Sequence, residues 1–167
     1  ETTVDCLRGT YKLDASRIVH DLGRTIIPTV DRGQIEGGLA QGLGWVTLEE
    51  LVFTQEGRLT SSALSTYKAP DAEFMPETME LKLLENVENP GGPLGSKAVG
   101  EPPFMYGIAA FFAIRKAIQA FRENEEAGKE VRCPVTAEQV LLDLYPNFAK
   151  STAVSYTHLR AHETVGN

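Results

Sequence analysis

The stretch from residue 31 to residue 46 joins the periodicity of a helix to an unusual number of glycines. Its apolar residues recur every three or four positions and predict one helical stripe. The stripe consists of Ile35, Leu39, Leu43 and Val46, and the other side is predicted to hold Gly37, Gly38, Gly42 and Gly44. Each glycine inside a helix costs about 1 kcal/mol relative to alanine. Something must therefore approach this backbone closely, either a neighbouring element or a ligand. Asp31 is predicted to be the N-cap.

Short strands are predicted on both sides of this helix. β-Leaning runs precede it at residues 3–7 and 17–22, and runs at 49–54 and 58–61 flank a turn and predict a hairpin. Residues 65–76 have no period and predict an extended crossing segment. Residues 79–84 alternate and predict a strand with one apolar side, formed by Met79, Leu81 and Leu83.

A second main helix is predicted from Phe104 to Phe121, directly after two prolines. Prolines suit a helix start because their missing amide donors do no harm there. A short last helix is predicted from Thr136, whose spacing from Gln139 is that of a capping box, to about Leu144. The predicted fold class is α+β, with short strands packed with two main helices.

Composition narrows the classes of partner. The chain has 167 residues, of which 42% are hydrophobic and 23% charged, so it can bury a core of its own. A net charge of −7 argues against binding to nucleic acid or to anionic membranes. No apolar run approaches the roughly 18 residues of a membrane span. Cys6 and Cys133 are too few to hold an iron–sulfur cluster, and they favour a reducing, cytoplasmic compartment.

The two ends of the chain carry expectations of their own. Because the chain begins at Glu1 and in mid-pattern, we expect a C-terminal fragment of a longer protein. Residues 155–167 show no apolar period and hold His158 and His162, four positions apart as in a metal-binding helix. Glu163 follows the second histidine, so the zinc-protease order is absent. The tail resembles a translated sequencing adapter, and we expect residues 1–154 to form the domain and 155–167 a non-native or disordered tail.

The loop at residues 95–104 holds the main candidate for chemistry. A phosphate-binding loop needs Gly before Lys and Ser or Thr after it, and here Ser96 precedes Lys97 and Ala98 follows. Glu101 lies between Gly100 and two prolines that restrict its direction. Apolar walls would raise its pKa towards that of a general base, whereas a helix N-terminus would lower it. The alternative from the residues alone is that Glu101 caps the following helix.

Five motifs, in order and register over about residues 3–149, resemble the closing part of the molybdopterin-binding portion of xanthine dehydrogenases. These enzymes, with aldehyde oxidases, are molybdenum hydroxylases. The motifs are Gly33-Gln34-Ile35-Glu36-Gly37-Gly38, Gln41-Gly42-Leu43-Gly44, Thr47-Leu48-Glu49-Glu50-Leu51, Ser65-Thr66-Tyr67-Lys68 and Ser96-Lys97-Ala98-Val99-Gly100-Glu101-Pro102-Pro103.

The resemblance implies roles for individual residues. Glu101 matches the family's general base, and Gln34 matches a glutamine that hydrogen-bonds the molybdenum cofactor. A loop along the pterin is matched by Ser96, Lys97, Ala98, Val99 and Gly100. Nothing matches a molybdenum ligand. The sequence departs from the family at residues 89–95, which are richer in Gly and Pro, and this departure bears on the substrate rather than on the reaction class.

The resemblance also implies an activity and partners. The implied reaction is hydroxylation of a purine of the xanthine or hypoxanthine type at an electron-poor carbon with oxygen derived from water. Aldehyde oxidation is the runner-up, and a non-catalytic remnant or a reading frame that never folds alone are the alternatives. [2Fe–2S] clusters and FAD are expected elsewhere in the full enzyme, which is expected to be a homodimer, and the isolated fragment is expected to be inactive. His20 is interpreted as structural, and Tyr67 and Lys68 are weaker candidates for a pocket.

Overall fold

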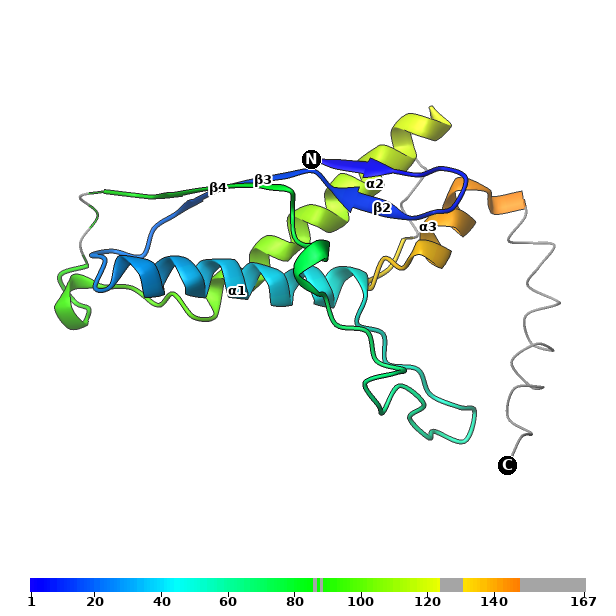
Figure 1. The fold of residues 1–167 in the computed structure, drawn as a ribbon, viewed down its shortest axis with the longest axis horizontal. Helices are drawn as coiled ribbons and strands as arrows, with labels where there is room; N and C mark the ends of the chain where they lie inside the picture. Colours follow the sequence, from blue (N-terminus) through cyan, green and yellow to red (C-terminus); the bar gives the residue numbers. More distant parts are fainter. Residues whose placement is uncertain (86, 88, 124–130, 148–167) are drawn as a thin grey trace.

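Figure 1 shows the computed structural model of the chain, which describes residues 1–85, 87, 89–123 and 131–147. The predicted tail, residues 155–167, lies outside the described residues. The strands are β1 (Thr2–Val4), β2 (Tyr11–Leu13), β3 (Ala15–His20) and β4 (Thr78–Leu83). The α-helices are α1 (Pro28–Thr47), α2 (Ile108–Arg122) and α3 (Ala137–Leu144), and the 3-10 helices are η1 (Ala72–Phe74), η2 (Pro93–Gly95) and η3 (Pro102–Gly107). The predicted α+β class is confirmed.

A parallel ribbon of β3 and β4 lies along α1 (Figure 1). Parallel strands need a long crossover between them, and α1 lies in that connection. In β4 every second residue is half-buried, and these residues are Met79, Leu81 and Leu83. They pack on the same core as Ile35 and Leu39 of α1, as the alternating sequence predicted.

A second, smaller core lies at the other end of α2. Here the antiparallel pair of β1 and β2 faces α2, and α3 closes the cluster. The Tyr11 hydroxyl donates to the Val135 carbonyl at 2.6 Å, which ties β2 to the segment before α3. The predicted cap of α3 is confirmed, because Thr136 Oγ1 accepts from the Gln139 amide at 3.3 Å.

The start of α1 differs from the prediction. The helix begins at Pro28 with Ile27 as N-cap, so the assignment of Asp31 as N-cap was wrong. Asp31 lies one turn inside the helix, where its carboxylate reaches back to accept from the Ile26 amide at 3.1 Å. The reason is that Pro28 fixes a helical φ three residues before Asp31, which starts the helix earlier.

The glycines of α1 are explained by a neighbouring element. A Cβ on Gly42 would lie 2.0 Å from the Phe104 carbonyl oxygen, and one on Gly38 would lie 2.9 Å from Cβ of Pro103. Both glycines are buried on the side of the apolar stripe, so their placement on the opposite side was wrong. At Gly37 a methyl would meet open space. The backbone of η3 therefore lies directly against α1, and η3 begins at the residue after Glu101.

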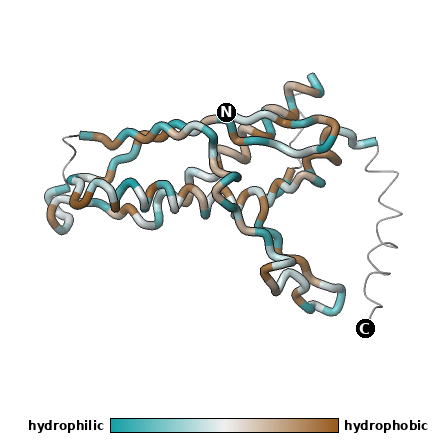
Figure 2. The backbone as a smooth tube through the Cα atoms, viewed as in Figure 1, coloured by the Kyte–Doolittle hydropathy of each residue, from teal (hydrophilic) through white to brown (hydrophobic). Residues whose placement is uncertain are grey.

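Residues 49–68 form an arm that projects away from the two cores (Figure 1). The predicted hairpin appears as one isolated antiparallel bridge between Phe53 and Leu59, with Thr54 N–H donating to Arg58 O at 2.9 Å. Figure 2 shows apolar residues along this arm, and Phe53, Leu51 and Leu64 are exposed.

The helix formed by η3 and α2, Pro102–Arg122, is long and apolar enough to cross a membrane by length and composition alone. Core helices of soluble proteins have the same length and composition. Its residues Ala110, Ile114 and Ile118 are buried in the two cores, whereas Met105, Phe112 and Phe121 are exposed.

Candidate functional site

The loop that precedes Glu101 is attached to the end of β3. The Lys97 amide donates to Leu22 O at 2.7 Å and the Arg24 amide donates to Gly95 O at 2.9 Å. Between these bonds, Gly23 and Ser96 form an antiparallel bridge. Gly23 has a φ of +67°, and a Cβ on it would lie 2.5 Å from the Gly95 oxygen. The approach is therefore possible only because residue 23 is a glycine.

Side chains strengthen this attachment. Lys97 Nζ lies 2.5 Å from the Asp21 carboxylate. Hydrogen bonding from Lys97 lowers the pKa of Asp21, and a bond from the Gly23 amide acts in the same direction. The Ser96 hydroxyl donates to the Pro93 carbonyl at 2.7 Å, inside the loop. Lys97 and Ser96, both predicted cofactor contacts, thus also hold the loop in place.

Gln34 and the loop come together, although 66 positions separate Gln34 from Gly100 in the sequence. Gln34 is exposed on the second turn of α1, and a Cβ on Gly100 would lie 3.4 Å from its Oε1. Gly100 is the residue directly before Glu101. The predicted cofactor-binding glutamine therefore lies beside the residue that precedes the predicted base, and both Gln34 and Glu101 are exposed.

Glu101 occupies the N-cap position of η3, and its carbonyl accepts from the Phe104 amide at 3.0 Å. Its side chain accepts no capping hydrogen bond, and it is exposed. The alternative that the carboxylate serves as a helix cap was therefore wrong. Pro102 and Pro103 at N1 and N2 offer no amide hydrogen, and the next amide, that of Phe104, donates to the Glu101 carbonyl instead of to its carboxylate.

The loop also presents free backbone donors. In the described part of the chain, no acceptor is bound to the amides of Ala98, Val99, Gly100 or Glu101. Val99 is half-buried against the core, whereas Ala98 and Gly100 are exposed. This part of the loop therefore combines unbound amide donors with the nearby Gln34 carboxamide, and Lys97, whose ammonium group is paired with Asp21, precedes it. Among the described residues, no group of three His, Cys, Asp or Glu side chains is placed to hold a metal ion.

Two features beside the loop were not predicted from the sequence. His20, treated there as a lone structural histidine, is 4% exposed and shares a hydrogen bond of 2.5 Å with the Tyr106 hydroxyl. Burial lowers the pKa of His20. Asp21 was not singled out, and no local pattern reveals that it pairs with Lys97. Tyr67 donates to the Glu49 carboxylate at the base of the arm, away from this loop.

The comparisons with known proteins agree with this geometry. The family model of the molybdopterin cofactor-binding domain matches residues 1–76. Xanthine dehydrogenase of Drosophila pseudoobscura pseudoobscura is 43% identical over 122 residues, which are 73% of this chain and 9% of that protein. Xanthine dehydrogenase/oxidase of Felis catus is 39% identical over 145 residues, 84% of this chain and 11% of that protein. The chain belongs to the xanthine dehydrogenase and aldehyde oxidase family of molybdenum hydroxylases.

A solved structure supports the assignment of the chain to this family. The aldehyde oxidoreductase of Desulfovibrio gigas superposes with a TM-score of 0.68 and 30% identity, over 86% of this chain and 14% of that one. The chain spans about a tenth of the length of the two relatives. The predicted family and the molybdopterin cofactor are thereby confirmed, and the individual roles of the site residues stay predictions.

Proposed function

We propose that the full-length protein hydroxylates a purine of the xanthine or hypoxanthine type, with Glu101 as the general base. The observation that carries this proposal is the meeting of Gln34 with Gly100, beside a Glu101 carboxylate that no capping bond occupies. A general base needs a carboxylate free to take up a proton, and a capping carboxylate would have its lone pairs engaged.

The outward side of the loop suits the pterin of the cofactor. A pterin is a flat heterocycle with many nitrogen and oxygen atoms, so it needs several hydrogen-bonding groups around its edge. The unbound amides of residues 98–101, the Gln34 carboxamide and Lys97 would supply them. When bound, the cofactor supplies the oxidising centre and takes up the electrons. We propose Gln34, Ser96, Lys97, Ala98, Val99 and Gly100 as the contacts to it.

The role of Glu101 is to move a proton. Its carboxylate would accept a proton from the water-derived oxygen that attacks the substrate. Loss of this proton makes the oxygen a better nucleophile towards the electron-poor carbon of the substrate. General base catalysis of this kind is typically worth about 10²–10⁴ in rate. Pro102 and Pro103 hold the backbone beside the base, and the burial of Pro103 against Gly38 fixes η3 to α1.

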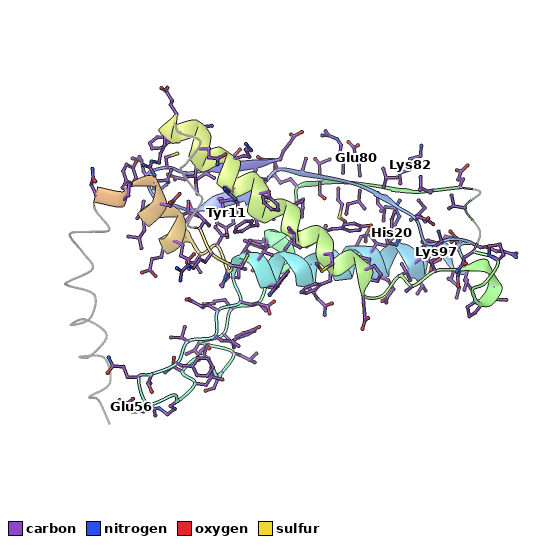
Figure 3. All side chains as sticks on the ribbon, turned by 180° about the vertical axis from the view of Figure 1, so that it is seen from behind. Tyr11, His20, Glu56, Glu80, Lys82 and Lys97 are labelled. Carbon is purple, nitrogen blue, oxygen red and sulfur yellow. The ribbon has the colours of Figure 1, made fainter. Side chains whose placement is uncertain are left out.

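The replacement Glu101→Gln in the full-length enzyme tests the base. The amide keeps the shape but cannot take up the proton, so we expect kcat to fall by at least about 10²-fold while the molybdenum content stays at the wild-type level. The matched control is Glu56→Gln, because Glu56 lies exposed at the tip of the arm, far from His20 and Lys97 (Figure 3). Near-normal turnover of Glu101→Gln at full molybdenum occupancy would contradict the assignment and favour a non-catalytic remnant.

Aldehydes are the second substrate class to consider, because the Desulfovibrio gigas structure is an aldehyde oxidoreductase. The xanthine dehydrogenase relatives, at 39% to 43% identity, favour purines. Comparing kcat/KM for hypoxanthine with that for an aromatic aldehyde separates the two classes.

We further propose that iron–sulfur clusters and FAD lie elsewhere in the full-length enzyme. We also propose that this enzyme forms a homodimer and acts in the cytoplasm.

A further inference from the structure

Five consecutive residues at the end of β3, His20 to Arg24, contact the Glu101 region on both of its sides. On the near side they bind Gly95, Ser96 and Lys97, through the two backbone bonds, the bridge and the ion pair described above. On the far side His20 binds Tyr106. We call residues 20–24 the clamp. Figure 3 shows His20 and Lys97 at the same end of the molecule, beside α1.

The part of this segment before η3, residues 98–101, has few contacts of its own, whereas η3 itself packs on α1. The amides of residues 98–101 have no acceptor in the described part of the chain, and Val99 alone among these four residues packs on the core. Glu101 follows Lys97 by four positions and precedes Tyr106 by five. The direction of Glu101 therefore depends on how firmly Lys97 is held on one side and on how firmly η3, with Tyr106, is held on the other.

The two side-chain contacts of the clamp come from adjacent residues on opposite faces of the strand end. Asp21 is half-exposed and reaches the loop, with Nζ of Lys97 at 2.5 Å and the Gly23 amide donating to its Oδ1 at 2.9 Å. His20 is buried, and its ring lies edge-on to the Tyr106 ring at 5.7 Å between centroids. Successive side chains of a strand point to opposite faces, so one strand end can hold both sides of the turn that carries Glu101.

We propose that Asp21 and His20 are positioning residues for Glu101: the clamp holds Lys97 and Tyr106 so that the carboxylate between them points at the substrate. This inference rests on the proposed function. Neither residue touches the reacting atoms, and both act through the loop. A partly exposed ion pair adds little to stability. The pair of Asp21 and Lys97 therefore matters for geometry, and its loss should affect turnover more than folding.

The first test is Asp21→Asn in the full-length enzyme. Asparagine keeps the size and the bond from the Gly23 amide but removes the charge that holds Lys97. We expect kcat to fall between about 10- and 100-fold, because small displacements of a catalytic group are costly, with KM within about twofold of wild type. Molybdenum content and melting temperature should stay at wild-type values. Hydrogen exchange of the amides of residues 98–106 should become faster, which reports the loosened loop independently of activity.

The matched control is Glu80→Gln. It removes a more exposed ion pair, Arg17 with Glu80 at 3.3 Å, from the same β3–β4 ribbon but away from the loop. We expect kcat and the hydrogen exchange of residues 98–106 to be unchanged in Glu80→Gln.

The second test is Tyr106→Phe, which keeps the ring contact with His20 but removes the hydroxyl. We expect this variant to speed hydrogen exchange around Glu101 and to lower kcat, as Asp21→Asn does.

Other results would overturn the inference. If kcat and exchange in Asp21→Asn and in Tyr106→Phe match wild type, the clamp does not position the base. If kcat falls only in proportion to a loss of molybdenum or of folded protein, the residues serve cofactor retention or stability. Normal turnover of Glu101→Gln is a different outcome, because it would remove the proposed function itself. Restoration of kcat by Asp21→Glu, which returns the charge, would support the clamp.

Discussion

His20 is a titratable side chain held inside an apolar core. It is 4% exposed, and its Nε2 has no hydrogen-bond partner in the described residues. Burial lowers the pKa of His20 below its ordinary value of 6.5, because the charged imidazolium loses its hydration there. The neighbouring Asp21 acts in the opposite direction with a smaller effect. The histidine is therefore neutral at pH 7, and its Nδ1 is hydrogen-bonded with the Tyr106 hydroxyl.

This burial predicts a pH dependence of stability. Because the pKa of His20 is lower in the folded chain than in the unfolded chain, its stabilising contribution is present above about pH 6.5 and is lost as the pH falls through the folded-state pKa. We expect His20→Phe to reduce the difference in melting temperature between pH 7.5 and pH 5. Thermal unfolding of the purified chain at both pH values measures this, with Tyr106→Phe as a control that keeps the histidine. An unchanged difference in His20→Phe would contradict the prediction.

Glu101 shows how a residue-scale alternative was resolved. Sequence alone left two roles open, and the structure excludes one of them, because the Glu101 side chain makes no capping hydrogen bond; the role as general base stays a prediction. Glu101 is exposed, so the described residues do not enclose it in the apolar walls that would favour a general base.

At the scale of elements, the contact of α1 with η3 determines where the base loop ends. Gly42 and Gly107 meet there, since a Cβ on Gly107 would lie 2.2 Å from the carbonyl carbon of Gly42. Two backbones can approach so closely only without side chains between them. The glycines give α1 a low intrinsic helix propensity, and its packing against η3 compensates for this loss of stability.

This contact predicts opposite effects for two alanine substitutions in one helix. Gly42→Ala should destabilise the chain by about 1–3 kcal/mol, because its methyl would overlap the Phe104 carbonyl oxygen, 2.0 Å away. Gly37→Ala should stabilise it by up to about 1 kcal/mol, because a methyl there meets open space and alanine favours the helix. Urea unfolding of the two variants measures both effects. Equal effects would show that helix propensity, not contact, explains the glycines.

At the scale of the whole molecule, the residues of the candidate site are open to solvent. Gln34, Lys97 and Glu101 are exposed, and the apolar side chains of Ile26, Ile27 and Leu94 are exposed as well. The chain covers 9% to 11% of the length of its xanthine dehydrogenase relatives, so most of the binding energy for a large cofactor would have to come from other parts of such a protein.

The isolated chain of 167 residues should therefore bind no cofactor tightly and show no turnover. We expect less than about one-tenth of an equivalent of molybdenum in the purified chain after expression in a host that makes the cofactor, since a protein that contributes only a few of the contacts pays the full cost of association. Elemental analysis measures the metal, and the full-length enzyme from the same host is the control. Stoichiometric molybdenum in the isolated chain would contradict this prediction.

The sequence by itself determined the local elements and the family. The helix period of 104–121, the alternation of 79–84 and the cap at Thr136 are short-range patterns. The structure confirms the strand and the cap, and it confirms the helix from Ile108 onwards, whereas residues 104–107 belong to the 3-10 helix η3. Motif order was enough to identify the family and its cofactor, because several spaced motifs in register rarely coincide by chance.

The tertiary structure alone decided how these elements meet. Asp21 and Lys97 lie 76 positions apart, and His20 and Tyr106 lie 86 apart. A local periodicity cannot predict such pairs. They form only because the parallel pairing of β3 with β4 and the packing of η3 on α1 bring these segments together. The same packing set the buried side of the α1 glycines, which propensity could not show. Local patterns arise from backbone sterics over a few residues, whereas the site depends on which distant surfaces fit together.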